Sequence, residues 1–122
     1  MKKILFLTFF IFISILGYSE NFFGVPILKI ISSEEGASQA TLTDEEMREN
    51  VVFIEQNAMG EYIWITRNNT VLNKIESGIY IIFNANNGVG YVKVNSLNGQ
   101  FIEHVHSGLM TITYYGVEIK DE

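Results

Sequence analysis

The strongest signal for the fold of this chain lies in residues 79–106, IYIIFNANNGVGYVKVNSLNGQFIEHVH. This stretch holds three short runs rich in β-branched and aromatic residues. The two breaks between the runs each contain an Asn-Gly pair, at Asn87-Gly88 and Asn98-Gly99. Such pairs favour the tight turns of β-hairpins, because both residues tolerate positive φ angles. The stretch therefore predicts antiparallel strands that are joined in sequence order by hairpins.

The same alternation of strand and turn continues on both sides of this stretch. Further apolar runs with polar or glycine-containing breaks cover 27–31, 51–56, 62–66, 71–75 and 109–119. Strands that follow one another about every 8–12 residues are typical of antiparallel sandwiches and barrels. We expect a mainly β domain, a small antiparallel β-sandwich or barrel of about six to eight strands with one short N-terminal helix. An α+β fold is the alternative.

One helix start is recognisable. The Thr43 side chain can accept a hydrogen bond from the first turn, and Glu46, three residues later, can reach back to the backbone of Thr43. Carboxylates in the first turn also suit the positive end of the helix dipole. We expect a helix of about two turns from Asp44, preceded by a loop over 32–41, where no periodicity is visible.

The last apolar run changes phase near its end. Ile112 and Tyr114 alternate on one face, whereas Val117 and Ile119 lie one residue out of phase with them. A β-bulge at Tyr115-Gly116 would return both sets to the core, and glycine is a residue that bulges favour. The pattern therefore predicts a bent final strand.

The chain opens with the features of a secretory leader. Two lysines precede a nearly unbroken apolar run over 4–16, and residues 17–19, Gly-Tyr-Ser, place small side chains at a cleavage site. The run is shorter than the roughly 20 apolar residues that a membrane-spanning helix needs. We therefore expect a signal peptide over 1–19 and a single β-rich domain over 20–122, exported to a bacterial periplasm or to the extracellular space.

Composition narrows the classes of function. The chain has no cysteine, which excludes disulfides and the lipid-bearing cysteine of bacterial lipoproteins. Its net charge is −6, and removal of the basic leader makes the remaining domain still more acidic. Such a surface repels nucleic-acid phosphates and anionic lipid headgroups. We expect no nucleic-acid partner and no membrane association once the leader is removed, and the oligomeric state stays open.

His104 and His106 are the two histidines of the chain. On a strand, residues two apart project from the same face about 6–7 Å from each other. Strands that supply two imidazoles to one divalent transition-metal ion use this spacing. The sequence identifies no third ligand. The alternative interpretation is a pair of half-exposed histidines beside a turn, and no other cofactor is indicated.

The aromatic residues suggest a binding surface. Tyr62 and Trp64 share one face of their expected strand, and Ile63 and Ile65 share the other. If the isoleucines face the core, the two aromatic side chains form an exposed patch for a protein, peptide or glycan partner. The alternative is that both faces are buried.

No motif assigns a catalytic residue. The chain lacks a Gly-x-Ser-x-Gly elbow, a P-loop and any cysteine nucleophile. The sequence favours an exported, non-enzymatic binding or interaction module. The alternative is a metal-binding protein or metal-dependent enzyme that uses the His104–His106 pair.

Overall fold

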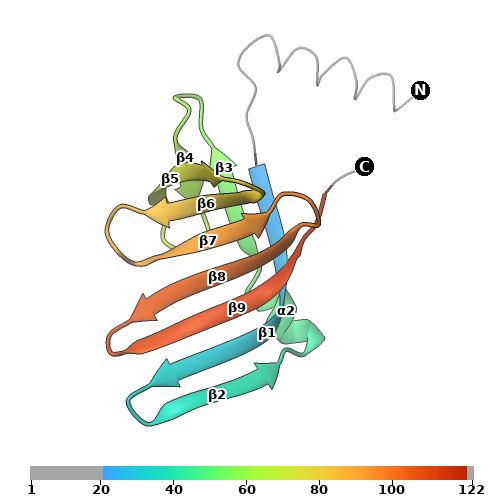
Figure 1. The fold of residues 1–122 in the computed structure, drawn as a ribbon, viewed down its shortest axis with the longest axis vertical. Coiled ribbons are helices and arrows are strands. Elements are labelled where there is room, and N and C mark those ends of the chain that lie inside the picture. The colour runs from blue at the N-terminus through green and yellow to red at the C-terminus, as the bar shows by residue number, and fades with distance from the viewer. Residues whose placement is uncertain (1–20, 121–122) are drawn as a thin grey trace, which may run out of the picture.

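Strands dominate the computed structural model, which describes residues 21–120 (Figure 1). The expected signal peptide lies outside this described part. Nine strands and one short helix follow one another in it. Their bounds are β1 Asn21–Ser33, β2 Gly36–Thr41, α2 Asp44–Glu49, β3 Val52–Gln56, β4 Tyr62–Trp64, β5 Thr70–Ser77, β6 Tyr80–Ala85, β7 Gly90–Asn95, β8 Gln100–Ser107 and β9 Met110–Glu118.

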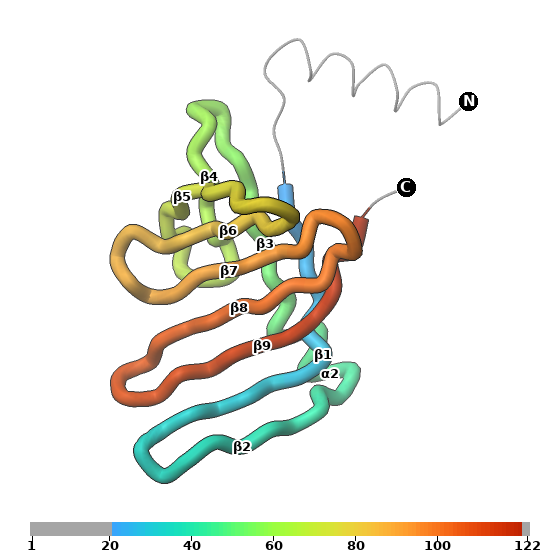
Figure 2. The backbone as a smooth tube through the Cα atoms, viewed as in Figure 1, coloured from blue at the N-terminus to red at the C-terminus, as the bar shows by residue number. Residues whose placement is uncertain are grey.

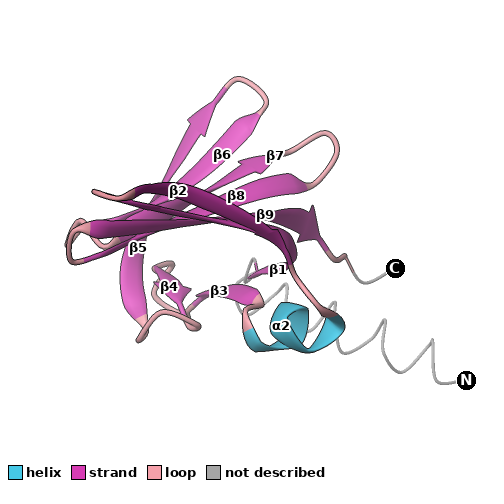
Figure 3. Cartoon of the chain, turned by 90° about the horizontal axis from the view of Figure 1, so that it is seen from below, coloured by secondary structure: helices cyan, strands magenta, loops and turns pink. Residues whose placement is uncertain are grey.

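Eight of these strands close into a barrel. Strands β3 to β9 pair antiparallel in sequence order, and β1 closes the sheet by pairing with both β3 and β9. The ninth strand, β2, is added to the second half of β1 (Figure 2). Figure 3 shows the resulting curvature, with β3 and β4 lying across from the arch that β8 and β9 belong to. The prediction of a mainly β, antiparallel sandwich or barrel of six to eight strands with one short helix is confirmed in its barrel form, with eight strands in the barrel and β2 as one strand more.

Closure depends on β1, which is long enough to contact three neighbours. Its residues 21–24 pair with β3, and its residues 28–33 pair with β2. Strand β9 runs along the opposite edge, and the register with β9 shifts between Pro26 and Leu28. An extra residue in one strand bends that strand and increases its twist. The irregularity in β1 therefore lies where the sheet must turn to close.

The predicted bulge at Tyr115-Gly116 is wrong in its placement. Strand β9 pairs with β8 without a register shift from Met110 to Val117, and the irregularity lies in the opposite strand, β1. Gly116 is required for a different reason: a Cβ atom at this position would lie 2.1 Å from the carbonyl oxygen of Val25. Glycine here allows the backbones of β1 and β9 to approach closely.

The helix prediction is confirmed in detail, and the loop prediction is wrong in part. In α2, the Glu46 N–H donates to Thr43 Oγ1 over 3.2 Å, and the Thr43 N–H donates to Glu46 Oε1 over 3.1 Å. Within the predicted loop, residues 36–41 form strand β2. All of its residues are exposed, so no apolar periodicity marked it; pairing with β1 makes it a strand. No helix in residues 21–120 is long and apolar enough to cross a membrane.

The barrel interior is a packed core of side chains from alternating strand positions. Trp64 and Val92 are fully buried, and the ring of Phe22 meets that of Phe101 edge-on at 5.5 Å between centroids. Along each strand, every second side chain therefore points into the barrel, and the side chains between them form its outer surface. The buried cluster consists of Phe22, Val52, Ile54, Trp64, Leu72, Phe83, Ala85, Val92, Val94, Phe101 and Val105.

Candidate functional site

The two histidines lie side by side on the outer face of β8. Their ring centroids are 4.9 Å apart, and the ring of His104 stacks on Tyr91 at 5.0 Å. His104 Nδ1 lies 3.1 Å from Thr113 Oγ1 on β9. Partial burial, and then the neighbouring His106, lower the pKa of the His104 imidazole below its usual value. The shared face that the sequence predicted is therefore present, and the imidazoles are in direct contact.

Within residues 21–120, no group of three His, Cys, Asp or Glu side chains is placed so that it could hold a metal ion. Glu103, the acidic residue next to His104 in sequence, is 1% exposed and points into the barrel. In the described part of the chain, a metal ion at this site would therefore have the two imidazoles as its candidate ligands.

Tyr62 and Trp64 share a face, as predicted, but this face is the interior one. Trp64 is fully buried, and Tyr62 packs on the core with its ring 5.3 Å from that of Phe83. Ile65, on the opposite parity, is 39% exposed. The expected exposed aromatic patch at these two residues is therefore wrong. The larger aromatic surface gains more from burial than the isoleucine side chains do.

A buried polar network surrounds Trp64 inside the barrel. Its Nε1–H donates to Glu103 Oε2 over 3.0 Å, and Arg67 Nη2 donates to Glu103 Oε1 over 2.9 Å. Burial raises the pKa of the Glu103 carboxyl above its usual value, although Arg67 and the indole N–H act against this shift. Burial would lower the pKa of Arg67, but its hydrogen bond and ion pair with Glu103 outweigh this and raise it.

The network continues from Arg67 to the end of the helix. The guanidinium carbon of Arg67 lies 5.7 Å from the centroid of the Tyr114 ring, and the Tyr114 hydroxyl donates to Asn50 Oδ1 over 3.1 Å. In the described residues, no buried side-chain nitrogen or oxygen lacks a hydrogen-bond partner. A fully satisfied network of this kind fixes the positions of β4, β8, β9 and α2 relative to one another.

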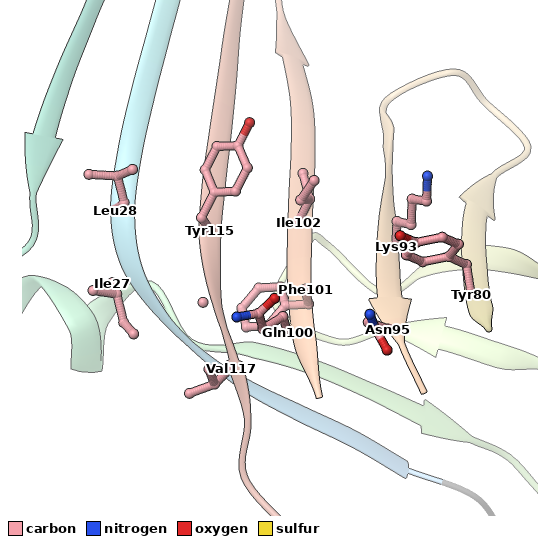
Figure 4. Close-up of a pocket in the computed structure, with 11 residues that line it drawn as sticks. Ile27, Leu28, Tyr80, Lys93, Asn95, Gln100, Phe101, Ile102, Tyr115 and Val117 are labelled. Carbon is pink, nitrogen blue, oxygen red and sulfur yellow. The ribbon is translucent and has the colours of Figure 1, made fainter. Parts of the chain in front are cut away.

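A groove with a volume of about 510 Å³ lies on the outer face of the barrel (Figure 4). Five strands, β1 and β6 to β9, contribute to it. Its lining is mostly aromatic and aliphatic, with one lysine and two side-chain amides. The lining residues are Ile27, Leu28, Tyr80, Lys93, Asn95, Gln100, Phe101, Ile102, Tyr115, Gly116 and Val117.

Strand register explains how the groove is assembled. Lys93 on β7 is opposite Ile102 on β8, Ile102 is opposite Tyr115 on β9, and Tyr115 is opposite Leu28 on β1. Directly opposed residues of antiparallel strands project from the same face as close neighbours. These four side chains therefore form one continuous row across the outer surface. The row ends at β1 beside the register shift that follows Pro26.

Comparisons with protein-family models, with curated proteins and with solved structures find no match to this chain. The groove and the histidine pair are therefore the features of the molecule that indicate a function.

Sequence reasoning missed the groove, although part of its signal was present. Ile102 and Lys93 directly follow Phe101 and Val92 on their strands, and successive side chains of a strand point to opposite faces. If Phe101 and Val92 face the core, Ile102 and Lys93 must face outward. No local pattern shows that β1 closes against β9. That contact alone brings Leu28 next to Tyr115 and completes the groove.

Proposed function

We propose that this protein is a small exported binding module whose ligand occupies the groove on the outer face of the barrel. The volume of about 510 Å³ carries this proposal. Small-molecule sites typically measure about 300–1,000 Å³ and have mainly apolar and aromatic walls with a few polar groups. The groove has this composition: aliphatic and tyrosine side chains surround one lysine and two amides.

The distribution of polar groups supports an outer site rather than an interior one. The buried carboxylate of Glu103 is engaged by Trp64 and Arg67, so it serves the packing of the barrel. The groove, in contrast, leaves Tyr80 and Tyr115 each more than a third exposed on its margins. Exposed aromatic side chains that gather on a concave surface favour ligand binding.

A neutral apolar dye, N-phenyl-1-naphthylamine, tests this proposal by its fluorescence on binding. Ile102→Gln places an amide in the centre of the groove, and Ile75→Gln makes the same change on β5, where Ile75 is 48% exposed outside the groove. We expect the dye to bind the unchanged protein and Ile75→Gln equally. Ile102→Gln should weaken binding about tenfold, because it removes apolar contact area. Equal binding by all three proteins would contradict the proposal.

Metal binding, alone or in a metal-dependent enzyme, is the second candidate function. The observation that favours it is the direct contact of the His104 and His106 imidazoles. Two imidazoles without a further ligand hold zinc or nickel weakly. Calorimetry on the protein and on the double variant His104→Ala, His106→Ala decides between the candidates. Sub-micromolar affinity that the double variant loses supports a metal function, and weak binding by both opposes it.

A further inference from the structure

The hairpin turn between β7 and β8 fixes the orientation of the Asn95 amide. Its Oδ1 accepts from the backbone N–H of Leu97 over 2.9 Å and from that of Asn98 over 3.4 Å. Because a backbone N–H can only donate, the oxygen must face the turn. The Nδ2 group is then the end that remains available, and it has no hydrogen-bond partner in the described residues.

The same turn fixes the Gln100 amide. The backbone N–H of Gln100 donates to Asn98 Oδ1 over 2.9 Å, so the other end of the Asn98 amide is its Nδ2 donor. This Nδ2 donates to Gln100 Oε1 over 3.3 Å. The acceptor of Gln100 is thus used within the turn, and its Nε2 donor is left for the groove.

Lys93 adds a positive charge to the same groove, and in Figure 4 its side chain extends away from Asn95 and Gln100. Its Nζ lies 4.3 Å from the centroid of the Tyr80 ring, and in the described residues Lys93 belongs to no ion pair. Among the residues that the structure describes, no Asp or Glu lines the groove. On an acidic protein, this groove is therefore a local site of positive charge.

The remaining walls are apolar. Ile102, Tyr115 and Val117 project from β8 and β9, and Ile27 and Leu28 lie next to them on β1 (Figure 4). A ligand that fills the groove must cover both this apolar part and the polar group of donors. Covering a donor without supplying an acceptor is costly, so the ligand needs an acceptor-rich end and an apolar body.

We propose that the groove selects small amphipathic carboxylates: molecules that carry one carboxylate on an aliphatic or aromatic body. The carboxylate accepts from Asn95 Nδ2 and Gln100 Nε2, the positive charge of Lys93 in the same groove attracts it, and the body packs on the row of apolar side chains. This inference rests on the proposed binding function of the groove. It adds the sign of the ligand's charge and the position of the charged end, next to the β7–β8 turn.

Three probes with one tail and different head groups test the selectivity: octanoate, octanol and octylammonium. Each is titrated below its micelle-forming concentration against purified protein expressed from the full sequence, by displacement of N-phenyl-1-naphthylamine. We expect octanoate to bind roughly tenfold more tightly than octanol, because hydrogen bonds to a charged acceptor are stronger than those to a hydroxyl. Octylammonium should bind most weakly, since it faces Lys93.

Two isosteric variants each lower the charge of the site by one unit without disturbing the turn. Asn95→Asp and Gln100→Glu each keep the oxygen that the turn uses and replace the free amide donor with a carboxylate oxygen. Either change should weaken octanoate about tenfold, strengthen octylammonium and leave octanol unchanged. Gln39→Glu on the exposed strand β2 is the matched control, since it changes the net charge equally outside the groove.

The outcomes separate this inference from the proposed function. Dye binding that depends on Ile102, together with equal affinities for the three probes, overturns the carboxylate inference and leaves the binding function standing. Octanoate affinity that is unaffected by Gln100→Glu also overturns the inference, because the acid then binds elsewhere. If no probe binds in a way that depends on Ile102, the proposed function fails as well.

Discussion

Glu103 connects most of the polar interior through its two carboxylate oxygens. One receives the indole N–H of Trp64, and both receive donors from Arg67. Trp64 is fully buried, whereas the Arg67 side chain keeps 28% exposure and can reach water. Loss of the carboxylate therefore costs more free energy at Trp64 than at Arg67, because the buried indole N–H has no alternative hydrogen-bond partner.

Replacement of Glu103 by alanine should destabilise the barrel by about 2–4 kcal/mol, since it leaves the Trp64 N–H unsatisfied and opens a small cavity. Glu103→Gln should cost less, because the amide oxygen can still accept from the indole. Urea denaturation of the three proteins measures both effects. A Glu103→Ala protein as stable as the unchanged one would show that the network contributes nothing to folding.

The same residue predicts a pH dependence. Burial raises the pKa of Glu103 in the folded chain above its ordinary value of 4.5, so the folded state holds the proton more tightly than the unfolded state. Its contribution to the free energy of unfolding is therefore full below the unfolded pKa and is lost as the pH rises through the folded pKa. Relative to Glu103→Gln, the unchanged protein should lose stability as the pH rises above the ordinary carboxyl pKa of 4.5 and through the raised pKa of the folded state. A relative gain over this range contradicts the prediction.

The pairing of β1 with β9 closes the sheet into a barrel. These two strands are distant in sequence, and their backbones meet most closely where Gly116 faces Val25 and Pro26. The absence of a side chain at this point determines how near the two edges can come. A methyl group at Gly116 should therefore lower the stability of the whole barrel.

Gly116→Ala should destabilise the protein by about 3 kcal/mol, because its Cβ would meet backbone atoms of β1 that cannot move independently. Gly78→Ala is the comparison: its surroundings are open, and the cost of about 1 kcal/mol comes from a positive φ of 61°. Thermal or urea unfolding measures both. A larger loss for Gly78→Ala than for Gly116→Ala would contradict the role of close approach.

For the whole molecule, the barrel must be stable without covalent cross-links, since the sequence has no cysteine. A closed sheet suits this requirement, because closure leaves few unpaired strand edges and encloses one continuous core. The extra strand β2 retains one free edge in the described part of the chain. Because the sequence has no cysteine, an oxidising compartment would add no disulfide to this fold.

We predict that residues 1–19 are removed on export. Expressed with these residues in a bacterial host, the protein should be recovered from the periplasm with Glu20 as its first residue, because residues 1–19 have the layout that signal peptidase recognises. Intact-mass measurement identifies the N-terminus. A membrane-bound product that still begins with Met1 would oppose the export proposal.

Most strands and the helix could be predicted from the sequence. Asn-Gly pairs and alternating apolar residues placed most strands, and the Thr43–Glu46 capping box placed the helix. These signals are local, since a turn or a cap depends on residues a few positions apart. The sequence also placed His104 and His106 on one face, because side chains two apart on a strand must share it.

The burial of the aromatic face and the groove on the outer face became visible only in the tertiary structure. Tyr62, Ile63 and Trp64 are apolar on both parities, so the alternation could not tell that the aromatic side fills the barrel. Strand β2 carried no apolar pattern, and the groove exists because β9 closes against β1. Such contacts join residues far apart in sequence, and their energy comes from burial and shape that no local pattern encodes.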